Sequence, residues 1–216
     1  MREVLPGVFH WTIQWPGWWS LESYWVRTAS GGVLIDPLEC FGLDDLEKAD
    51  DVTAIFITVG WHERSARLFA KRTGAEVYVP SLDTSMVEDI EHFKGYGHGF
   101  VHHSGVRAIG VPGLTAGEQA ILSDMHGGTL FVGDALGTTA KWAPGGLRLG
   151  GHPNGHPQPS QTLVHLLDYE FQNLMPGHGR PIIGGARDEL AKLISSTVST
   201  STGSPRIKWM PSNGAL

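Results

Sequence analysis

The sequence has a single cysteine, Cys40, among its 216 residues. One cysteine excludes an internal disulfide framework and every zinc site built on a Cys-x-x-Cys pair. It fits a reducing compartment, where thiols stay unpaired. No histidine pair is placed to activate this thiol, so we interpret Cys40 as a small buried hydrophobic residue.

Charge of one sign and long apolar runs are also scarce. Charged residues make up 18% of the chain, and the net charge of −6 leaves no basic surface for nucleic acid. No apolar run approaches the ~20 residues that span a bilayer, and no apolar core with a cleavage site follows the N-terminus. We therefore expect a cytoplasmic protein with no nucleic-acid or membrane partner. A small-molecule ligand and a homo-oligomer both stay open.

What the chain does have is a strand pattern in both halves. Runs of β-branched, aromatic and apolar residues predict strands at 4–14, 21–35, 53–59, 75–80, 106–111, 118–123 and 129–133. Amphipathic patterns predict helices at 62–73, 83–94, after Ser160 and at 187–196. This order predicts two packed sheets with helices outside, in one domain over 1–196. The Ser/Thr/Gly/Pro-rich segment 197–216 is expected to be a flexible or loosely docked tail.

Four glycine- or acid-containing turns follow strand-like segments of the chain. They are Asp36-Pro37, the segment TVGWHERSA at 58–66, Gly133-Asp134, and Pro176-Gly177-His178-Gly179. Residues at strand ends on one rim of a sheet can converge on one site. Carboxylates and an imidazole delivered in this way suit Zn, Mn or Fe.

The order of these turns resembles the metallo-β-lactamase superfamily. The matching pieces are LID at 34–36, TVGWHER at 58–64, PGLTAG at 112–117, GD at 133–134 and PGHG at 176–179. Together they cover roughly residues 5–195. The resemblance implies an α+β fold, the four-layer αβ/βα sandwich of metallo-β-lactamase type, with Asp36 in a structural role beside the site.

The resemblance also implies a two-metal site, and here the sequence departs from the family pattern. The positions of the first metal's ligands hold residues that cannot bind a metal: Val59, Trp61 and Leu114. The positions of the second metal's ligands hold residues that can: Glu63, Asp134 and His178. A full dinuclear centre is therefore not expected.

Three interpretations stay open. In the first, Glu63, Asp134 and His178 are the catalytic residues and hold one Zn, Mn or Fe ion, which activates water to cleave an ester, thioester, lactone or phosphate-like bond. In the second, no metal binds, Arg64 neutralises Glu63 or Asp134, His178 hydrogen-bonds Asp134, and the protein is a pseudoenzyme that binds a ligand or partner. In the third, a different metal set forms from the local histidines, with His62 as a shifted ligand. A helix start or a loop would have to move His62 by one residue, which reverses its direction.

Tryptophans form the other unusual feature, with several around one predicted hairpin tip: Trp11, Trp15, Trp18 and Trp19. The resemblance implies that this hairpin overhangs the cleft. A substrate pocket is therefore predicted from Trp15, Trp18, Trp61, Arg64 and Leu114. In the alternative interpretation the tip folds back and plugs the pocket, with Trp61 inside it.

Two further groups of histidines lie in glycine-rich segments: His98, His102 and His103, and then His152 and His156. An H-x-x-x-H pair binds metal well on a helix, and Pro153 with Gly155 prevents a helix there. Solvated loop histidines are the expectation for both groups, and their role stays open.

Overall fold

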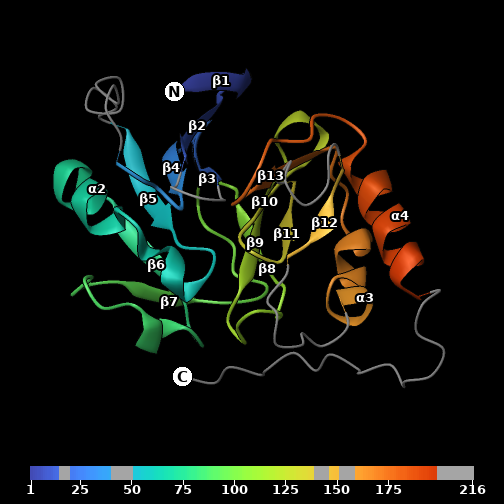
Figure 1. The fold of residues 1–216 in the computed structure, drawn as a ribbon. Coiled ribbons are helices and arrows are strands. Elements are labelled where there is room, and N and C mark those ends of the chain that lie inside the picture. The colour runs from blue at the N-terminus through green and yellow to red at the C-terminus, as the bar shows by residue number, and fades with distance from the viewer. Residues whose placement is uncertain (15–19, 40–50, 139–145, 151–158, 199–216) are drawn as a thin grey trace.

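A computed structural model describes residues 1–14, 20–39, 51–138, 146–150 and 159–198. Figure 1 shows two sheets packed face to face with helices on the outside. The predicted tail beyond residue 198 and the tryptophans at 15, 18 and 19 lie outside the described residues. Within the described residues, no helix combines the length and the apolar character needed to cross a membrane.

The first sheet has seven strands in the order β1-β2-β3-β4-β5-β6-β7. Their bounds are Arg2–Leu5, Val8–Gln14, Ser20–Thr28, Gly31–Ile35, Val52–Phe56, Glu76–Pro80 and Lys94–Tyr96. Strands β1 to β4 pair antiparallel, and β4 to β7 pair parallel. Because parallel strands end at the same edge, the segments that follow β4 and β5 begin side by side.

The second sheet has four strands in the order β13-β10-β9-β8. Their bounds in chain order are Arg107–Gly110 (β8), Gln119–Ser123 (β9), Thr129–Val132 (β10) and Asn173–Pro176 (β13). Strands β10 and β13 are parallel, with Val132 opposite Pro176 at their carboxyl ends. A short pair, β11 (Leu136–Gly137) and β12 (Arg148–Leu149), follows β10 in the chain.

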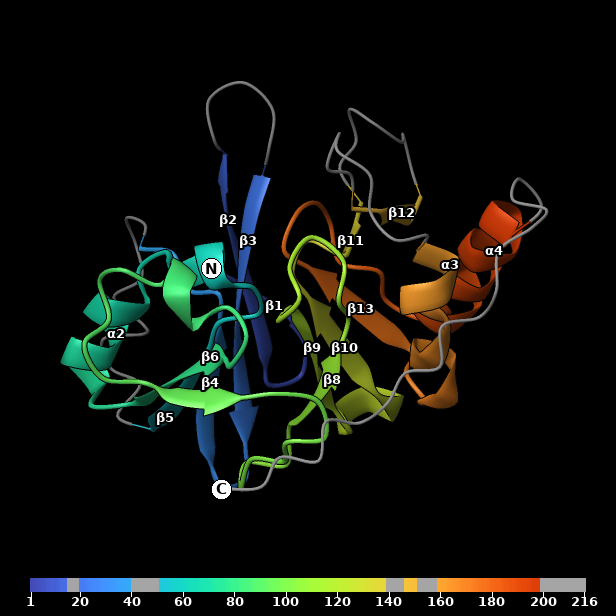
Figure 2. The ribbon, with the colours of Figure 1, turned by 90° about the horizontal axis from the view of Figure 1, so that it is seen from below.

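Helices cover the outer face of each sheet, as Figure 2 shows. Helix α2 (Ala66–Thr73) lies outside the first sheet, and α3 (Pro159–Thr162) and α4 (Ala186–Val198) lie outside the second. Four single turns of 3-10 helix complete the described elements: η1 (Gly60–Glu63), η2 (Thr84–Met86), η3 (Met125–Gly127) and η4 (Val164–Asp168).

Two predicted helices differ in the structure. The helix predicted at 62–73 is divided into η1 and α2, because Arg64 has a φ of 47°, in the left-handed region. The helix predicted at 83–94 is only the turn η2, followed by irregular chain. The backbone N–H groups of Glu88 and Asp89 donate to the carboxylate of Glu63, so they make none of the bonds that would continue a helix.

The apolar core forms three layers, which explains the four-layer architecture. Aromatic and aliphatic side chains fill the space between the sheets, among them Tyr24, Phe56, Phe131 and Met175. A second cluster lies between the first sheet and α2, and a third lies between the second sheet and α4. Full burial of such side chains contributes roughly 1.5–3 kcal/mol each.

The two sheets meet at the rim where β4, β5, β10 and β13 end. The backbone N–H of Glu22 in β3 donates to the carbonyl of Gly177 after β13 at 3.0 Å. The backbone N–H of Gln119 in β9 donates to the carbonyl of Thr58 after β5 at 2.8 Å. These bonds fix the segments after β5 and β13 relative to each other, although they belong to different sheets.

Candidate metal centre

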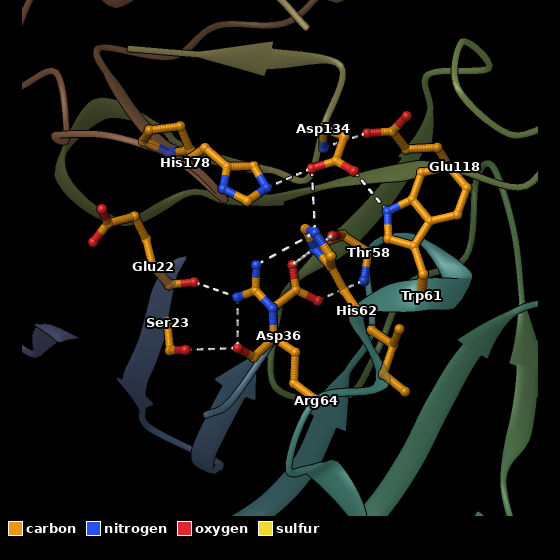
Figure 3. Close-up of polar contacts among 12 residues, drawn as sticks. Glu22, Ser23, Asp36, Thr58, Trp61, His62, Arg64, Glu118, Asp134 and His178 are labelled. Carbon is orange, nitrogen blue, oxygen red and sulfur yellow. Dashed lines mark hydrogen bonds and ion pairs between the residues drawn. The ribbon is translucent and has the colours of Figure 1, made fainter. Parts of the chain in front are cut away.

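Three side chains converge at this rim: His62, Asp134 and His178. Their ligand atoms all lie within 4.8 Å of one another. The Nε2 atom of His62 lies 3.2 Å from Oδ1 of Asp134, and the Nε2 atom of His178 lies 2.9 Å from the same oxygen. Figure 3 shows Asp134 facing both imidazoles. The three residues come from η1, from the turn after β10 and from the turn after β13.

The segment after β5 is anchored by Asp36, which follows β4. The carboxylate of Asp36 accepts the backbone N–H of Thr58 at 2.8 Å and the Thr58 hydroxyl at 2.5 Å. It also lies 2.8 Å from Nδ1 of His62. Asp36 and Arg64 both have a φ of 47°, a conformation that costs free energy for residues other than glycine. The strained backbone places the imidazole of His62, which is 4% exposed, inside the rim.

Each histidine is held through its second ring nitrogen. Nδ1 of His62 faces the carboxylate of Asp36, and Nδ1 of His178 lies 2.9 Å from the backbone carbonyl of Ser20. An ionised carboxylate and a carbonyl only accept hydrogen bonds, so both Nδ1 atoms carry protons. A neutral imidazole in this state has a bare lone pair on Nε2. This is the arrangement typical of metal-ligating histidines.

Charge is concentrated around Asp134. Burial alone raises the pKa of Asp134, but the positive charges of His62 and His178 outweigh it and hold the pKa well below its usual value. Burial and Arg64 lower the pKa of His62, while the charges of Asp134 and Asp36 raise it, and the balance is a pKa of about 9. Without a metal, the proton on His62 therefore balances the carboxylate of Asp134.

A buried oxygen of Asp134 tests whether these residues fit a metal ion. Oδ1 lies 3.2 Å from Nε2 of His62 and 2.9 Å from Nε2 of His178. These contacts are hydrogen bonds when the rings are protonated on Nε2, and with neutral rings this buried oxygen has no donor among the residues that the structure describes. Ligand atoms around a tetrahedral ion with bonds of ~2.0–2.1 Å stand ~3.3 Å apart, close to the two contacts here. Two imidazoles and one carboxylate are also the donor set of catalytic zinc sites and of mononuclear Fe(II) sites. The residues present fit one divalent ion.

Trp61 contacts the other oxygen of the same carboxylate. Its indole Nε1–H donates to Oδ2 of Asp134 at 2.6 Å, while the side chain is 45% exposed (Figure 3). Trp61 is therefore not enclosed in a pocket, whereas the hairpin tip predicted to plug that pocket lies outside the described residues. Leu114, predicted to stand beside it, is half-buried in the 112–117 turn.

Glu118 fixes the turn that carries Asp134, and sequence reasoning missed it. Its Oε1 accepts the backbone N–H groups of Asp134 and Ala135 at 2.7 and 2.6 Å. Burial raises the pKa of Glu118, the charge of Asp134 adds to this effect, and the two N–H bonds offset part of it, so the pKa is about 8. A lone glutamate at the start of a predicted strand gave no signal of this role.

Arg64 points its guanidinium toward the rim but does not pair as predicted. Its Nη1 donates to the backbone carbonyls of Glu22 and Asp36 at 2.6 and 3.0 Å, and its Nη2 lies 3.3 Å from Nε2 of His62. Within the described residues no ion pair joins Arg64 to Glu63 or Asp134. Arg64 thus supports the backbone under His62 and adds a positive charge beside it.

Glu63 is the predicted ligand that the structure places elsewhere. Its carboxylate accepts the backbone N–H groups of Glu88 and Asp89 at 3.0 and 2.9 Å. On the turn η1, the side chains of His62 and Glu63 point in different directions. His62, and not Glu63, therefore lies together with Asp134 and His178. The geometry matches the third interpretation, in which His62 is shifted by one residue into the ligand position.

The other predicted residues lie apart from this group or outside the described residues. His98 accepts the backbone N–H of Gly110, and His102 contacts Ser104 and lies at a tilt against the ring of His103. The expectation of a solvated histidine is wrong for His102, which is buried. Outside the described residues are Trp15, Trp18, Trp19, His152 and His156.

Comparison with solved structures agrees with this architecture. The chain is similar to the DIM-1 metallo-beta-lactamase, with a TM-score of 0.70 and 16% identity, covering 93% of this chain and 97% of that one. It is also similar to a metallo-beta-lactamase family protein of Thermus thermophilus, with a TM-score of 0.66 and 18% identity, covering 91% and 81%. A third similar structure is that of the protein TTHA1623 in a di-iron-bound form. Its TM-score is 0.66 and its identity 20%, and the match covers 86% of this chain and 98% of that one.

No protein-family model matches the sequence, and no curated protein matches it. The likeness to solved structures nevertheless identifies the architecture: the αββα sandwich is the metallo-β-lactamase fold. The predicted fold class is confirmed.

Proposed function

We propose that the protein is a mononuclear metal-dependent hydrolase, with His62, Asp134 and His178 as the ligands of one divalent ion. The observation that carries this proposal is the convergence of three ligand atoms at one buried point: Oδ1 of Asp134 lies 3.2 and 2.9 Å from the Nε2 atoms of His62 and His178. Three acceptor atoms that converge in this way require either protons or a cation between them. Zn, Mn and Fe(II) all accept this donor set.

A bound ion of this kind lowers the pKa of its water toward ~7 and polarises a carbonyl or phosphoryl oxygen. The chain's own residues supply the rest. Asp36 and the Ser20 carbonyl orient both Nε2 atoms toward Asp134, and Glu118 holds the turn of Asp134. Arg64 adds a fixed positive charge that would stabilise negative charge developing beside His62. The proposed substrate is a small molecule with an ester, thioester, lactone or phosphate-like bond.

A second candidate is a metal-free protein that binds a ligand or partner. The observation that favours it is the pKa of about 9 for His62, which lets a proton take the place of the ion at neutral pH. Nη2 of Arg64, 3.3 Å from Nε2 of His62, also places a cation close to the proposed metal position. The two candidates differ in whether the folded chain takes up one metal ion.

A thermal-shift titration of chelator-treated protein with Zn, Mn and Fe(II) separates them. An ion that binds only the folded state raises the melting temperature, by an amount that grows with its concentration. We expect at least one ion to do so, and the rise to disappear in His178→Ala. His103→Ala, which removes an exposed histidine from another loop, is the matched control and should keep the rise. No rise with any ion would contradict the metal site and favour the metal-free candidate. A rise that survives His178→Ala would show that the ion binds outside the group of His62, Asp134 and His178.

A further inference from the structure

Trp61 makes an unusual combination of contacts for a tryptophan. Its side chain is 45% exposed, whereas Trp11 and Trp25 are 4% and 6% exposed. Its indole N–H donates to Oδ2 of Asp134 at 2.6 Å, a short bond to an ionised carboxylate. Exposure of a large aromatic ring is unfavourable in itself, so the hydrogen bond is the contact that accounts for its orientation.

This bond divides the two oxygens of Asp134 between different partners. Oδ2 accepts the indole N–H, and Oδ1 alone faces His62 and His178. Glu118 fixes the backbone of the same turn, so Trp61 controls the remaining freedom, which is rotation of the carboxylate. A carboxylate without this bond is free to turn both oxygens toward an ion.

The backbone under Trp61 is fixed as well. The N–H of Gly60 donates to the carboxylate of Asp83 at 3.1 Å. A Cβ at position 60 would stand 2.8 Å from the Cβ of Met86 and 2.9 Å from that of Asp83, so this close approach requires glycine. The turn η1 therefore presents two adjacent side chains to one site: His62 to Oδ1 of Asp134, and Trp61 to Oδ2.

We propose that Trp61 is a positioning residue that makes Asp134 a ligand through one oxygen only. This inference rests on the proposed metal site and adds a residue to it. The indole N–H holds Oδ2 away from the ion, which preserves an open coordination position for water or substrate and leaves no second carboxylate oxygen for a further metal. The Nε1–H of Trp61 stabilises the negative charge on Oδ2, a role that a second cation would otherwise fill.

Cobalt(II) titrations of wild type, Trp61→Phe and Trp25→Phe test this proposal. Phenylalanine keeps an aromatic ring and removes the N–H. Loss of such an outer contact lowers metal affinity by roughly 10- to 100-fold. In Trp61→Phe we expect this loss, measured by competition with a chromophoric chelator. We also expect a weaker visible cobalt absorption, because binding through both Asp134 oxygens raises the coordination number. Trp25→Phe, which removes a buried indole with no contact to the trio, should change neither.

The outcomes distinguish failure of the proposed metal site from failure of the proposed role of Trp61. If wild type binds no cobalt, the proposed metal site and this inference both fall. If wild type binds cobalt and Trp61→Phe gives the same affinity and the same spectrum, only the role of Trp61 is overturned. Should Trp61→Phe fail to fold, the indole N–H proton signal of wild-type Trp61 replaces it as the readout. A strongly hydrogen-bonded signal that persists with metal supports the proposal, and one that loses its bond on metal uptake overturns it.

Discussion

Nε2 of His178 lies 2.9 Å from Oδ1 of Asp134, and the fold itself brings these two residues together. Asp134 follows β10 by one residue beyond Gly133, and His178 follows β13 by one residue beyond Gly177. The two strands pair in parallel up to Val132 and Pro176, so their turns leave the sheet side by side. Sheet register thus delivers one carboxylate and one imidazole to the rim, and η1 adds the second imidazole from the other sheet.

Metal uptake should release protons. His62 has a pKa of about 9 in the metal-free protein, so its imidazole is charged at pH 7 and must lose a proton before Nε2 can bind an ion. Below pH 9 the apparent affinity should fall as pH falls, by up to ~10-fold per pH unit for this one group. Calorimetric titration at pH 7 in buffers of different ionisation enthalpy should show about one proton released from His62 per ion. Uptake with no proton release at pH 7 contradicts the assignment of His62.

Removal of the Arg64 side chain should destabilise the metal-free protein. Arg64→Ala removes the donor that the carbonyls of Glu22 and Asp36 share. The Asp36 carbonyl keeps the hydroxyl of Ser23 at 2.7 Å, so the loss falls on the Glu22 carbonyl, and an unsatisfied buried group costs ~1–3 kcal/mol. Urea unfolding should therefore show a loss of ~1–3 kcal/mol, whereas Arg67→Ala, on the exposed side of α2, should change stability by less than ~0.5 kcal/mol. Because Arg64 supports carbonyls, adding Asp134→Asn should recover nothing. Recovery of stability in the double variant would show instead that Arg64 and Asp134 form the predicted ion pair.

Glu118→Gln should change how stability depends on pH. Glutamine can still accept the N–H groups of Asp134 and Ala135 through its amide oxygen, but it cannot ionise. The pKa of Glu118 is raised from 4.5 to about 8 by folding, so between these values the unfolded chain loses a proton that the folded protein keeps. Wild-type stability should therefore fall relative to Glu118→Gln as pH rises through this window, by up to ~1.4 kcal/mol per pH unit.

Urea unfolding of chelator-treated protein at several pH values measures this difference. The two proteins should be equally sensitive to pH above about 8, where the folded carboxyl is also ionised. Glu91→Gln is the matched control, since Glu91 is exposed, and it should follow the wild-type curve. Parallel curves for wild type and Glu118→Gln between pH 4.5 and 8 would show that Glu118 is not held protonated.

The two-sheet fold and part of the site could be predicted from the sequence because they depend on strand patterns and strand ends. Asp134 and His178 each follow an apolar run directly, so their place on a common rim needs no knowledge of side-chain packing. His62, the third residue of the candidate metal site, could not be found in the same way. The choice between His62 and Glu63 depends on the left-handed backbone of Arg64 and on the bonds from Glu88 and Asp89, which join segments far apart in the chain.

The measurement that tests the account most directly compares metal binding by His62→Ala and Glu63→Gln. Chelator-treated wild type should bind one equivalent of zinc or cobalt in equilibrium titration with elemental analysis. His62→Ala should lose this binding, because the second imidazole is gone. Glu63→Gln should keep it, because the Glu63 carboxylate accepts the N–H groups of Glu88 and Asp89 and faces no metal. Binding that survives His62→Ala and disappears in Glu63→Gln would contradict the site built on His62, Asp134 and His178.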